Sequence, residues 1–152
     1  MKYKDMTITD IGCGSGLGRR LLPHMDYIGV DAAEKCIEYC KQNYDGTFIC
    51  GDAAEFIKNV DKLNPIFLFS LDYLDLVTIE QYLQKTDDYF FAVHYNLPYL
   101  SSTSVYSGNR ELFYEIHPPD EIIARQELLK DFGVITTPLL GELNYKVSIL
   151  QR

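Results

Sequence analysis

The chain has 152 residues, a length typical of one domain with one hydrophobic core. It carries 22 acidic residues against 14 Lys and Arg, a formal net charge of −8, which argues against a nucleic-acid partner because such binding depends on neutralising phosphates. The sequence contains no apolar run of about 18 residues that could span a membrane, and Met1–Asp5 leads into a strand instead of a signal-peptide core, so we expect a cytoplasmic protein with no membrane partner.

The first predicted strand, Met6–Ile11, stops at a turn with four glycines in the seven residues 12–18. Glycine adopts positive φ without penalty and lets a ligand approach the main chain closely. Such a turn directly after a strand predicts a nucleotide-like ligand. The dinucleotide fingerprint needs G-x-G-x-x-G, but the sixth position is not glycine when counted from Gly12 or from Gly14. This spacing argues against an NAD-dependent oxidoreductase.

The spacing Asp10-x-Gly12-x-Gly14-x-Gly16 resembles motif I of the class I S-adenosylmethionine-dependent methyltransferases. The resemblance implies that the turn wraps the methionine half of the cofactor S-adenosylmethionine and that Asp10 anchors its amino acid end. It also implies the α/β fold of that family with a minimal N-terminus. That fold is a Rossmann-like, doubly wound, mostly parallel sheet with a C-terminal antiparallel hairpin.

The second predicted strand, Tyr27–Val30, follows a short helix at Leu17–His24 and ends at Asp31. A carboxylate at this position supplies the bidentate acceptor that two ribose hydroxyls need. We therefore expect Asp31 and the adjacent Ala32 to contact the cofactor. Alternatively, Asp31 only caps the helix predicted over Ala32–Tyr44.

The third predicted strand, Thr47–Cys50, is followed by Gly51-Asp52-Ala53 and a helix to Leu63. This segment resembles the family's adenine site, where the acid accepts from the adenine amino group and the next amide, here that of Ala53, donates to the ring. Asp52 could instead be an ordinary N-cap. Ligands of open α/β sheets bind at the carboxyl ends of the strands, so Asp10, Asp31 and Asp52 are predicted to converge on one ligand.

The fourth predicted strand, Asn64–Phe69, is continuously apolar, which indicates a sheet covered on both faces. It ends at Ser70–Asp75, a position that faces the methyl group and the substrate in the resembling family. The resemblance therefore implies that Leu71 contacts the cofactor and that Asp72 orients or deprotonates the acceptor. The family's Asn/Asp-Pro-Pro-aromatic motif is absent here, which leaves the substrate class open.

A helix at Val77–Lys85 and a fifth strand at Tyr89–His94 precede Tyr95-Asn96-Leu97-Pro98-Tyr99. These residues are similar to the Asn-Leu-Pro-Tyr motif with which the rRNA adenine dimethyltransferases grip an exocyclic amine. In that family the motif closes the fourth strand, whereas here it follows the fifth. An adenine-N6-type nucleic-acid methyltransferase is therefore kept as an alternative.

Residues 97–117 show no clear period and are rich in aromatic side chains, which favours a substrate loop. The predicted substrate contacts are Tyr95, Asn96, Tyr99, Tyr106 and Tyr114. The tyrosines could form part of a cage for a cationic amine, or pack over the sheet edge. If the acceptor must lose a proton, the candidates for a base are Asp72, His94 and His117.

The chain ends in a predicted helix, Glu121–Phe132, and two strands, Val134–Thr137 and Tyr145–Leu150, that form the hairpin. We expect one domain over residues 1–152. The four cysteines form no C-x-x-C pair, so we expect thiols and no metal site.

The resemblance implies an enzyme that transfers a methyl group in line from S-adenosylmethionine, and we expect the acceptor to be an amine, hydroxyl or carboxyl group of a small molecule. The other alternative is a non-catalytic partner subunit that binds the cofactor. Family members commonly carry helices ahead of the first strand, and here only about five residues precede it. We therefore expect an open site, or one that a homodimer or a partner subunit covers.

Overall fold

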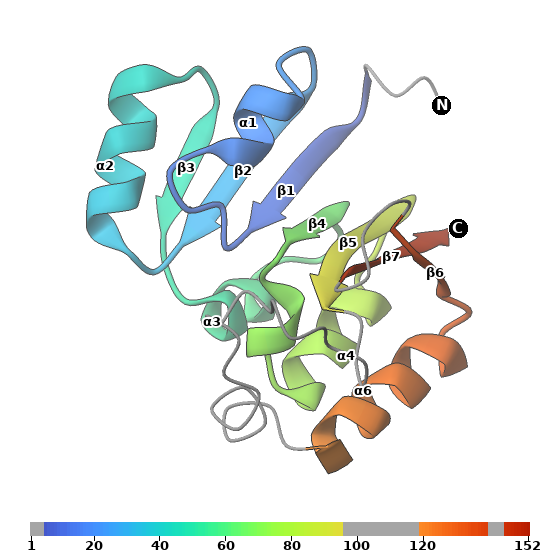
Figure 1. Cartoon of the computed structure of the whole chain (residues 1–152). Coiled ribbons are helices and arrows are strands. Elements are labelled where there is room, and N and C mark those ends of the chain that lie inside the picture. The colour runs from blue at the N-terminus through green and yellow to red at the C-terminus, as the bar shows by residue number, and fades with distance from the viewer. Residues whose placement is uncertain (1–4, 96–118, 140–144) are drawn as a thin grey trace.

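The computed structural model describes residues 5–95, 119–139 and 145–152, and a seven-stranded sheet forms its centre (Figure 1). The strands are β1 (Thr7–Ile11), β2 (Asp26–Asp31), β3 (Thr47–Cys50), β4 (Pro65–Leu68), β5 (Tyr89–Tyr95), β6 (Ile135–Pro138) and β7 (Tyr145–Gln151). Their order in the sheet is β3-β2-β1-β4-β5-β7-β6. The pairs among β1 to β5 are parallel, and β7 is antiparallel to both β5 and β6. The predicted doubly wound, mostly parallel sheet with a C-terminal antiparallel hairpin is confirmed.

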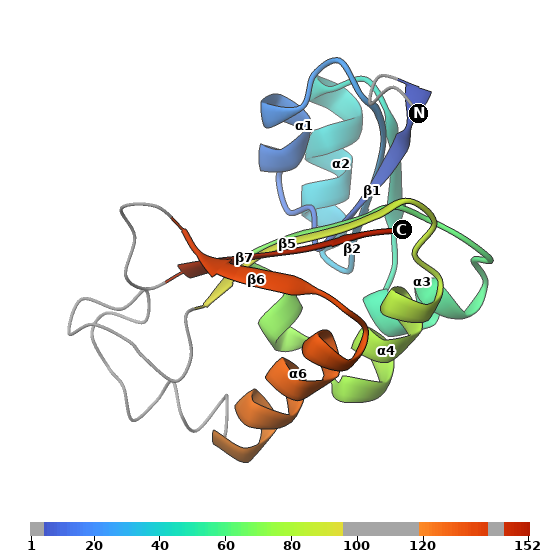
Figure 2. The same cartoon turned by 90° about the vertical axis from the view of Figure 1, so that its right-hand side faces the viewer.

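Helices lie on both faces of this sheet. They are α1 (Leu17–Leu21), α2 (Glu34–Asn43), α3 (Ala53–Lys58), α4 (Leu76–Gln84) and α6 (Pro119–Asp131), with a 3-10 turn η2 (Leu71–Tyr73) after β4. Figure 2 shows α1 and α2 on one face and α3, α4 and α6 on the other. Both faces of β4 are covered, and Pro65, Ile66 and Phe67 are buried, which explains the continuous apolar run of this strand.

Each face has its own hydrophobic core. The larger core joins the sheet to α3, α4 and α6, and it contains the fully buried rings of Phe67, Tyr82 and Phe90. The smaller core lies under α2, where Ile37 and Cys40 pack against the sheet. Aromatic and branched side chains fill both layers, so the carboxyl ends of the strands are held on a rigid base.

Several helices are shorter than the sequence predicts. The first ends at Leu21 and not at His24, because the amide of Leu22 closes the last turn on the carbonyl of Gly18. The third stops at Lys58 and not at Leu63. None of the helices in the described ranges is long and apolar enough to cross a bilayer. The predicted substrate loop, residues 97–117, lies outside the described residues.

Candidate functional site

A cleft of about 320 Å³ lies at the carboxyl ends of β1 to β4. Five residues predicted from the sequence to hold a cofactor line it: Gly12, Asp31, Ala32, Asp52 and Ala53. The cleft spans the point where the sheet order reverses between β1 and β4, which is where ligands bind in open α/β sheets.

The glycine turn that follows β1 borders this cleft. Gly12, Gly14 and Gly16 have φ of 75°, 53° and 101°, a region that other residues rarely adopt. A Cβ at Gly12 would lie 2.7 Å from the Cβ of Ser70, and one at Gly16 would lie 2.6 Å from the ring of Tyr44. Gly12 therefore lets the ends of β1 and β4 meet at the cleft, whereas Gly16 leaves room for the ring of Tyr44, which follows α2.

Asp31 ties the ends of β1 and β2 together. The amide of Gly14 donates to Oδ2 of Asp31 at 2.9 Å, and the amide of Ala33 donates to Oδ1 at 2.8 Å. These bonds fix the carboxylate at the cleft, and each of its oxygens keeps a further lone pair for a ligand. They also explain why α2 begins at Glu34, two residues later than predicted: the side chain of Asp31 bridges the turn ahead of the helix.

Asp52 both caps α3 and lines the cleft. Its Oδ1 accepts hydrogen bonds from the amides of Ala54 at 2.6 Å and Glu55 at 3.3 Å. The capping role considered in the sequence analysis is therefore real. It is compatible with ligand binding, because both amides use the same oxygen and the side chain is exposed at the cleft.

Asp10 lies beneath the glycine turn and not on the cleft. Its side chain is buried, and the hydroxyl of Tyr27 donates to its Oδ2. Its Oδ1 is buried without a hydrogen-bond partner among the described residues. Burial raises the pKa of Asp10 to about 6 against the lowering effect of the Tyr27 hydroxyl, and the charge of Asp31 raises it further. Of the three acids predicted to converge, the structure brings Asp31 and Asp52 to one cleft.

The segment after β4, expected from the sequence to face the substrate, supplies cleft residues that the sequence analysis did not name individually. Phe69, Ser70 and Tyr73 line the cleft, and Phe69 has a φ of 65°, rare for a residue with a side chain. The amide of Phe69 donates to the carbonyl of Val93 at 2.8 Å, and Ser70 Oγ donates to the carbonyl of Ile11 at 2.5 Å. Strained backbone held by neighbouring strands is common at binding sites. The signal in the sequence was a serine that ends an apolar strand.

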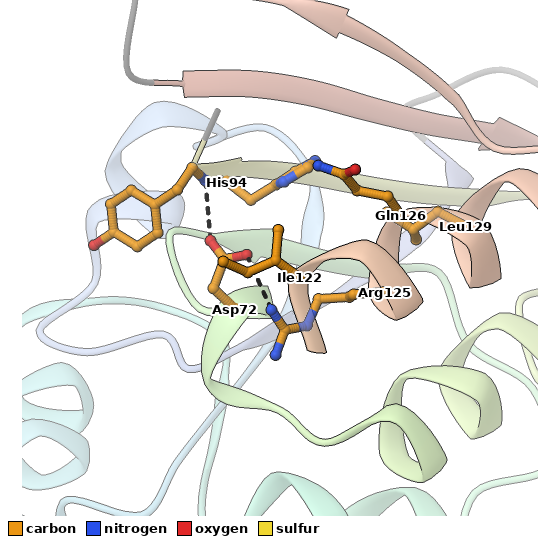
Figure 3. A pocket seen from close by; sticks show the side chains of 7 residues that line it. Asp72, His94, Ile122, Arg125, Gln126 and Leu129 are labelled. Atoms are coloured by element: carbon orange, nitrogen blue, oxygen red, sulfur yellow. Dashed lines mark hydrogen bonds and ion pairs between the residues drawn. The ribbon is translucent and has the colours of Figure 1, made fainter. Parts of the chain in front are cut away.

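Asp72 points away from the cleft, towards α6 (Figure 3). Its Oδ2 accepts from the amide of Tyr95 at 2.9 Å, and its Oδ1 lies 3.9 Å from Nη1 of Arg125. Burial raises the pKa of Asp72 to about 6, although the Tyr95 amide and Arg125 favour the charged form. Leu71, predicted as a cofactor contact, is fully buried in the larger core and does not line the cleft.

His94 is also directed away from the cleft. Its Nε2 lies 2.6 Å from Oγ of Ser148, and the ring faces α6 near Gln126 (Figure 3). Burial and then the charge of Lys146 lower the pKa of His94 to about 4, so the imidazole is neutral near pH 7. Asp72 and His94, predicted as acid–base candidates, thus occupy one buried polar layer beside the cleft.

Of the remaining predicted site residues, the structure describes Tyr95 alone. The hydroxyl of Tyr95 lies 3.4 Å from that of Tyr73, which places it next to the cleft. Five predicted site residues lie outside the described residues: Asn96, Tyr99, Tyr106, Tyr114 and His117. All four cysteines are thiols, and no group of His, Cys, Asp and Glu in the described ranges could hold a metal ion.

Comparisons with known proteins agree with this architecture. A family model described as "Methyltransferase domain" matches residues 8–89, more than half of the chain. No curated protein matches the chain.

Solved structures resemble the chain at low sequence identity. The plantazolicin methyltransferase BpumL, solved with SAH, is 16% identical with a TM-score of 0.67 over 97% of this chain and 76% of its own. A SAM-dependent methyltransferase from Archaeoglobus fulgidus is 17% identical with a TM-score of 0.67 over 99% and 88%. The magnesium protoporphyrin IX methyltransferase from Synechocystis PCC 6803, solved with bound SAM, is 16% identical with a TM-score of 0.63 over 97% and 70%. At these identities the likeness establishes the fold.

Proposed function

Because this chain belongs to the methyltransferase domain family, we infer that it is an S-adenosylmethionine-dependent methyltransferase, and we propose that its acceptor is a small molecule. The observation that carries the proposal is the cleft at the switch point between β1 and β4, lined by two fixed carboxylates and by Gly12, the first residue of the glycine turn. The methyl acceptor is an amine, hydroxyl or carboxyl group.

The residues of the cleft fit this cofactor. Asp31 offers two carboxylate oxygens, each already held by one backbone amide, and would accept the two ribose hydroxyls. Asp52 and the amide of Ala53 would recognise the edge of the adenine. The turn from Gly12 to Gly16 would hold the methionine half, and a Cβ at Gly14 would meet no atom within 4 Å, so the main chain there is open to a ligand.

When bound, the cofactor supplies a methyl group on a sulfonium, a carbon already activated for displacement. What the protein must add is alignment, because holding a nucleophile in line with that carbon lowers the barrier without any proton transfer. Phe69 and Tyr73, at the end of β4, border the cleft where the acceptor would lie. Asp72 contacts Arg125, and His94 contacts Ser148. We propose that Asp72 and His94 act as positioning residues for the segment after β4.

Three observations support a small-molecule acceptor over a nucleic acid. The net charge of −8 would repel a phosphate backbone. The solved structures with similar folds include methyltransferases named for plantazolicin and magnesium protoporphyrin IX. The segment similar to the adenine dimethyltransferase motif begins at the end of β5 and not at the end of β4. Coverage of the site by a second copy or a partner subunit stays a prediction.

A transfer assay with isotope-labelled S-adenosylmethionine tests the proposal. Small amines, phenols and carboxylates would be offered alongside single-stranded RNA and duplex DNA. We expect label in at least one small-molecule class and none in the nucleic acids. Label in RNA or DNA alone would support the adenine-type alternative, and binding of the cofactor without any transfer would support the non-catalytic one.

A further inference from the structure

Four aromatic side chains from separate elements meet beside the cleft, and we name Phe69, Tyr73, Tyr95 and Tyr145 the aromatic wall. The ring of Tyr145 lies between the other two strand-end rings: its centroid is 5.1 Å from that of Phe69 and 5.9 Å from that of Tyr95. Tyr95 and Tyr145 are direct partners in the β5–β7 ladder. The hydroxyl of Tyr73 lies 3.4 Å from the hydroxyl of Tyr95.

Two members of the aromatic wall present their rings to the cleft. Phe69 and Tyr73 line it and are 39% and 55% exposed, whereas Tyr95 is 7% exposed and contacts Tyr73 and Tyr145. The ring of Phe69 is held at this position by a left-handed backbone conformation that costs of order 1 kcal/mol or more. Exposed rings on a fixed support offer an apolar, planar surface to a ligand at little entropic cost.

The charged side chains of the cleft lie opposite the aromatic wall. Among the described lining residues, the charged side chains are Asp31 and Asp52, at the ends of β2 and β3. The aromatic wall belongs to the β4, β5 and β7 side, beyond β1 in the sheet. Asp72, a buried carboxylate on that side, is directed to Arg125 and the Tyr95 amide. A cage for a cationic amine would be stronger with a carboxylate at its rim, and the geometry of Asp72 does not provide one.

We propose that the aromatic wall selects acceptors in which the methylated group is attached, directly or through one methylene group, to a planar aromatic or heteroaromatic ring. The inference rests on the proposed function and deepens it, because it assigns the ring of the acceptor to the faces of Phe69 and Tyr73. Because aromatic rings gain from offset or edge-to-face packing on one another, an aromatic ligand should bind this surface measurably more tightly than a saturated ring of similar size.

Four probes separate ring preference from charge preference. Benzyl alcohol and cyclohexylmethanol form a neutral pair, and benzylamine and cyclohexylmethylamine form a cationic pair. Within each pair the group on the ring is the same, and only the ring changes from aromatic to saturated. Dissociation constants would be measured by ligand-observed NMR, with and without S-adenosylhomocysteine. We expect each aromatic probe to bind about 2- to 10-fold more tightly than its saturated partner. Equal affinities within both pairs, or no binding of any probe, would overturn the proposal.

The same titrations distinguish a cation cage. If both amines bind more tightly than both alcohols whatever the ring, the aromatic wall recognises charge and the proposal is wrong. S-adenosylhomocysteine is titrated separately. Its failure to bind would overturn the proposed function, and the ring preference would still be read from the titrations without it.

Variants tie the preference to the aromatic wall. Phe69→Leu and Tyr73→Leu each remove one ring while keeping an apolar side chain, and we expect the aromatic-to-saturated ratio to fall towards one. Tyr39→Leu is the matched control, because Tyr39 is 48% exposed on α2 and does not line the cleft. An unchanged ratio in both wall variants would contradict the assignment.

Discussion

At the scale of single residues, Gly12 and Gly14 lie in one turn but in different surroundings. Both have positive φ, so any other residue there would be strained. A Cβ at Gly12 would collide with Ser70, whereas a Cβ at Gly14 would point into open space. The two glycines therefore serve the site differently: Gly12 lets the ends of β1 and β4 meet, and Gly14 exposes main chain.

Alanine substitutions should separate these roles. We expect Gly12→Ala to lower the free energy of unfolding by about 2–4 kcal/mol, from backbone strain plus overpacking against Ser70. Gly14→Ala should cost only the strain, about 1–2 kcal/mol. Urea denaturation of both variants measures the difference. Equal losses of unfolding free energy in the two variants would mean that overpacking against Ser70 does not contribute to the cost of Gly12→Ala.

Asp10 gives the protein a pH-dependent stability with a definite sign. The pKa of its carboxyl is raised to about 6 in the folded state from an ordinary value of 3.8, so between these pH values the folded state binds more protons than the unfolded state. Stability from this group is therefore full below pH 4 and is lost as the pH rises to about 6. The loss amounts to about 3 kcal/mol.

The substitution Asp10→Asn should remove this dependence while keeping the size of the side chain. We expect the wild type to lose stability relative to Asp10→Asn as the pH rises from 4 to 6, with a constant difference above about pH 7. Comparing the two proteins cancels other groups, including His94, whose lowered pKa of about 4 acts in the opposite direction. Parallel stability curves across this range would show that Asp10 is not the titrating group.

At the scale of elements, one buried ion pair fixes the segment after β4. Asp72 in η2 contacts the end of β5 through the Tyr95 amide and α6 through Arg125. Nη2 of Arg125 also donates to the carbonyl of Leu74, which lines the cleft, at 3.5 Å. This pair therefore links α6 to the wall of the cleft although neither charge reaches it.

A double-mutant cycle tests that link. Arg125→Met should cost about 2–4 kcal/mol, because it leaves the Asp72 carboxylate buried without its partner. Asp72→Asn should cost less, since an amide can still accept from Tyr95. The double variant should be close to Asp72→Asn alone, with a coupling energy of at least about 1 kcal/mol, as judged by urea denaturation. Additive losses would show that the two side chains act independently.

Activity in Asp72→Asn separates positioning from proton transfer. A positioning role predicts a modest rise in KM and a pH profile of kcat that keeps its shape. If Asp72 removed the acceptor's proton, kcat would instead collapse and the limb of the profile near pH 6 would disappear.

The sequence alone predicted the order of elements and a site at the carboxyl ends of the first strands, because hydrophobic periodicity and strand-end glycines and acids are local signals. It could not place Phe69, since the positive φ of this residue depends on bonds to distant strands, from its own amide to β5 and from the next residue, Ser70, to β1. Nor could it foresee that Asp10 lies under the turn, because burial by Tyr27 depends on the register of β1 against β2. The side-chain direction of Asp72 likewise depends on α6, about 50 residues away.

At the scale of the whole molecule, the cleft spans the two halves of the sheet, one from β1 to β3 and the other beginning at β4. Asp31 and Asp52 stand on the β2 and β3 side, while Phe69, Ser70 and Tyr73 stand on the side of β4. A ligand that contacts both sides binds the folded state and not the unfolded chain, so it must stabilise the fold.

This linkage predicts a thermal shift. S-adenosylhomocysteine at 100 times its dissociation constant should add about 2.7 kcal/mol to the free energy of unfolding. For a chain of this size that corresponds to a rise in Tm of about 5–10 °C by differential scanning fluorimetry. NAD at the same concentration should give no shift. A shift with NAD alone would favour the oxidoreductase that the glycine spacing argues against.

The central claim is that the carboxylate of Asp31 holds the cofactor at the switch point, and calorimetric titration of S-adenosylmethionine tests it most directly. The three proteins are the wild type, Asp31→Ala and the control Asp61→Ala, which removes an exposed acid that does not line the cleft. We predict that the wild type and Asp61→Ala bind equally and that Asp31→Ala binds about 10- to 100-fold more weakly, from the loss of hydrogen bonds to a charged group. Equal affinity in all three proteins, or no binding by the wild type, would contradict the account.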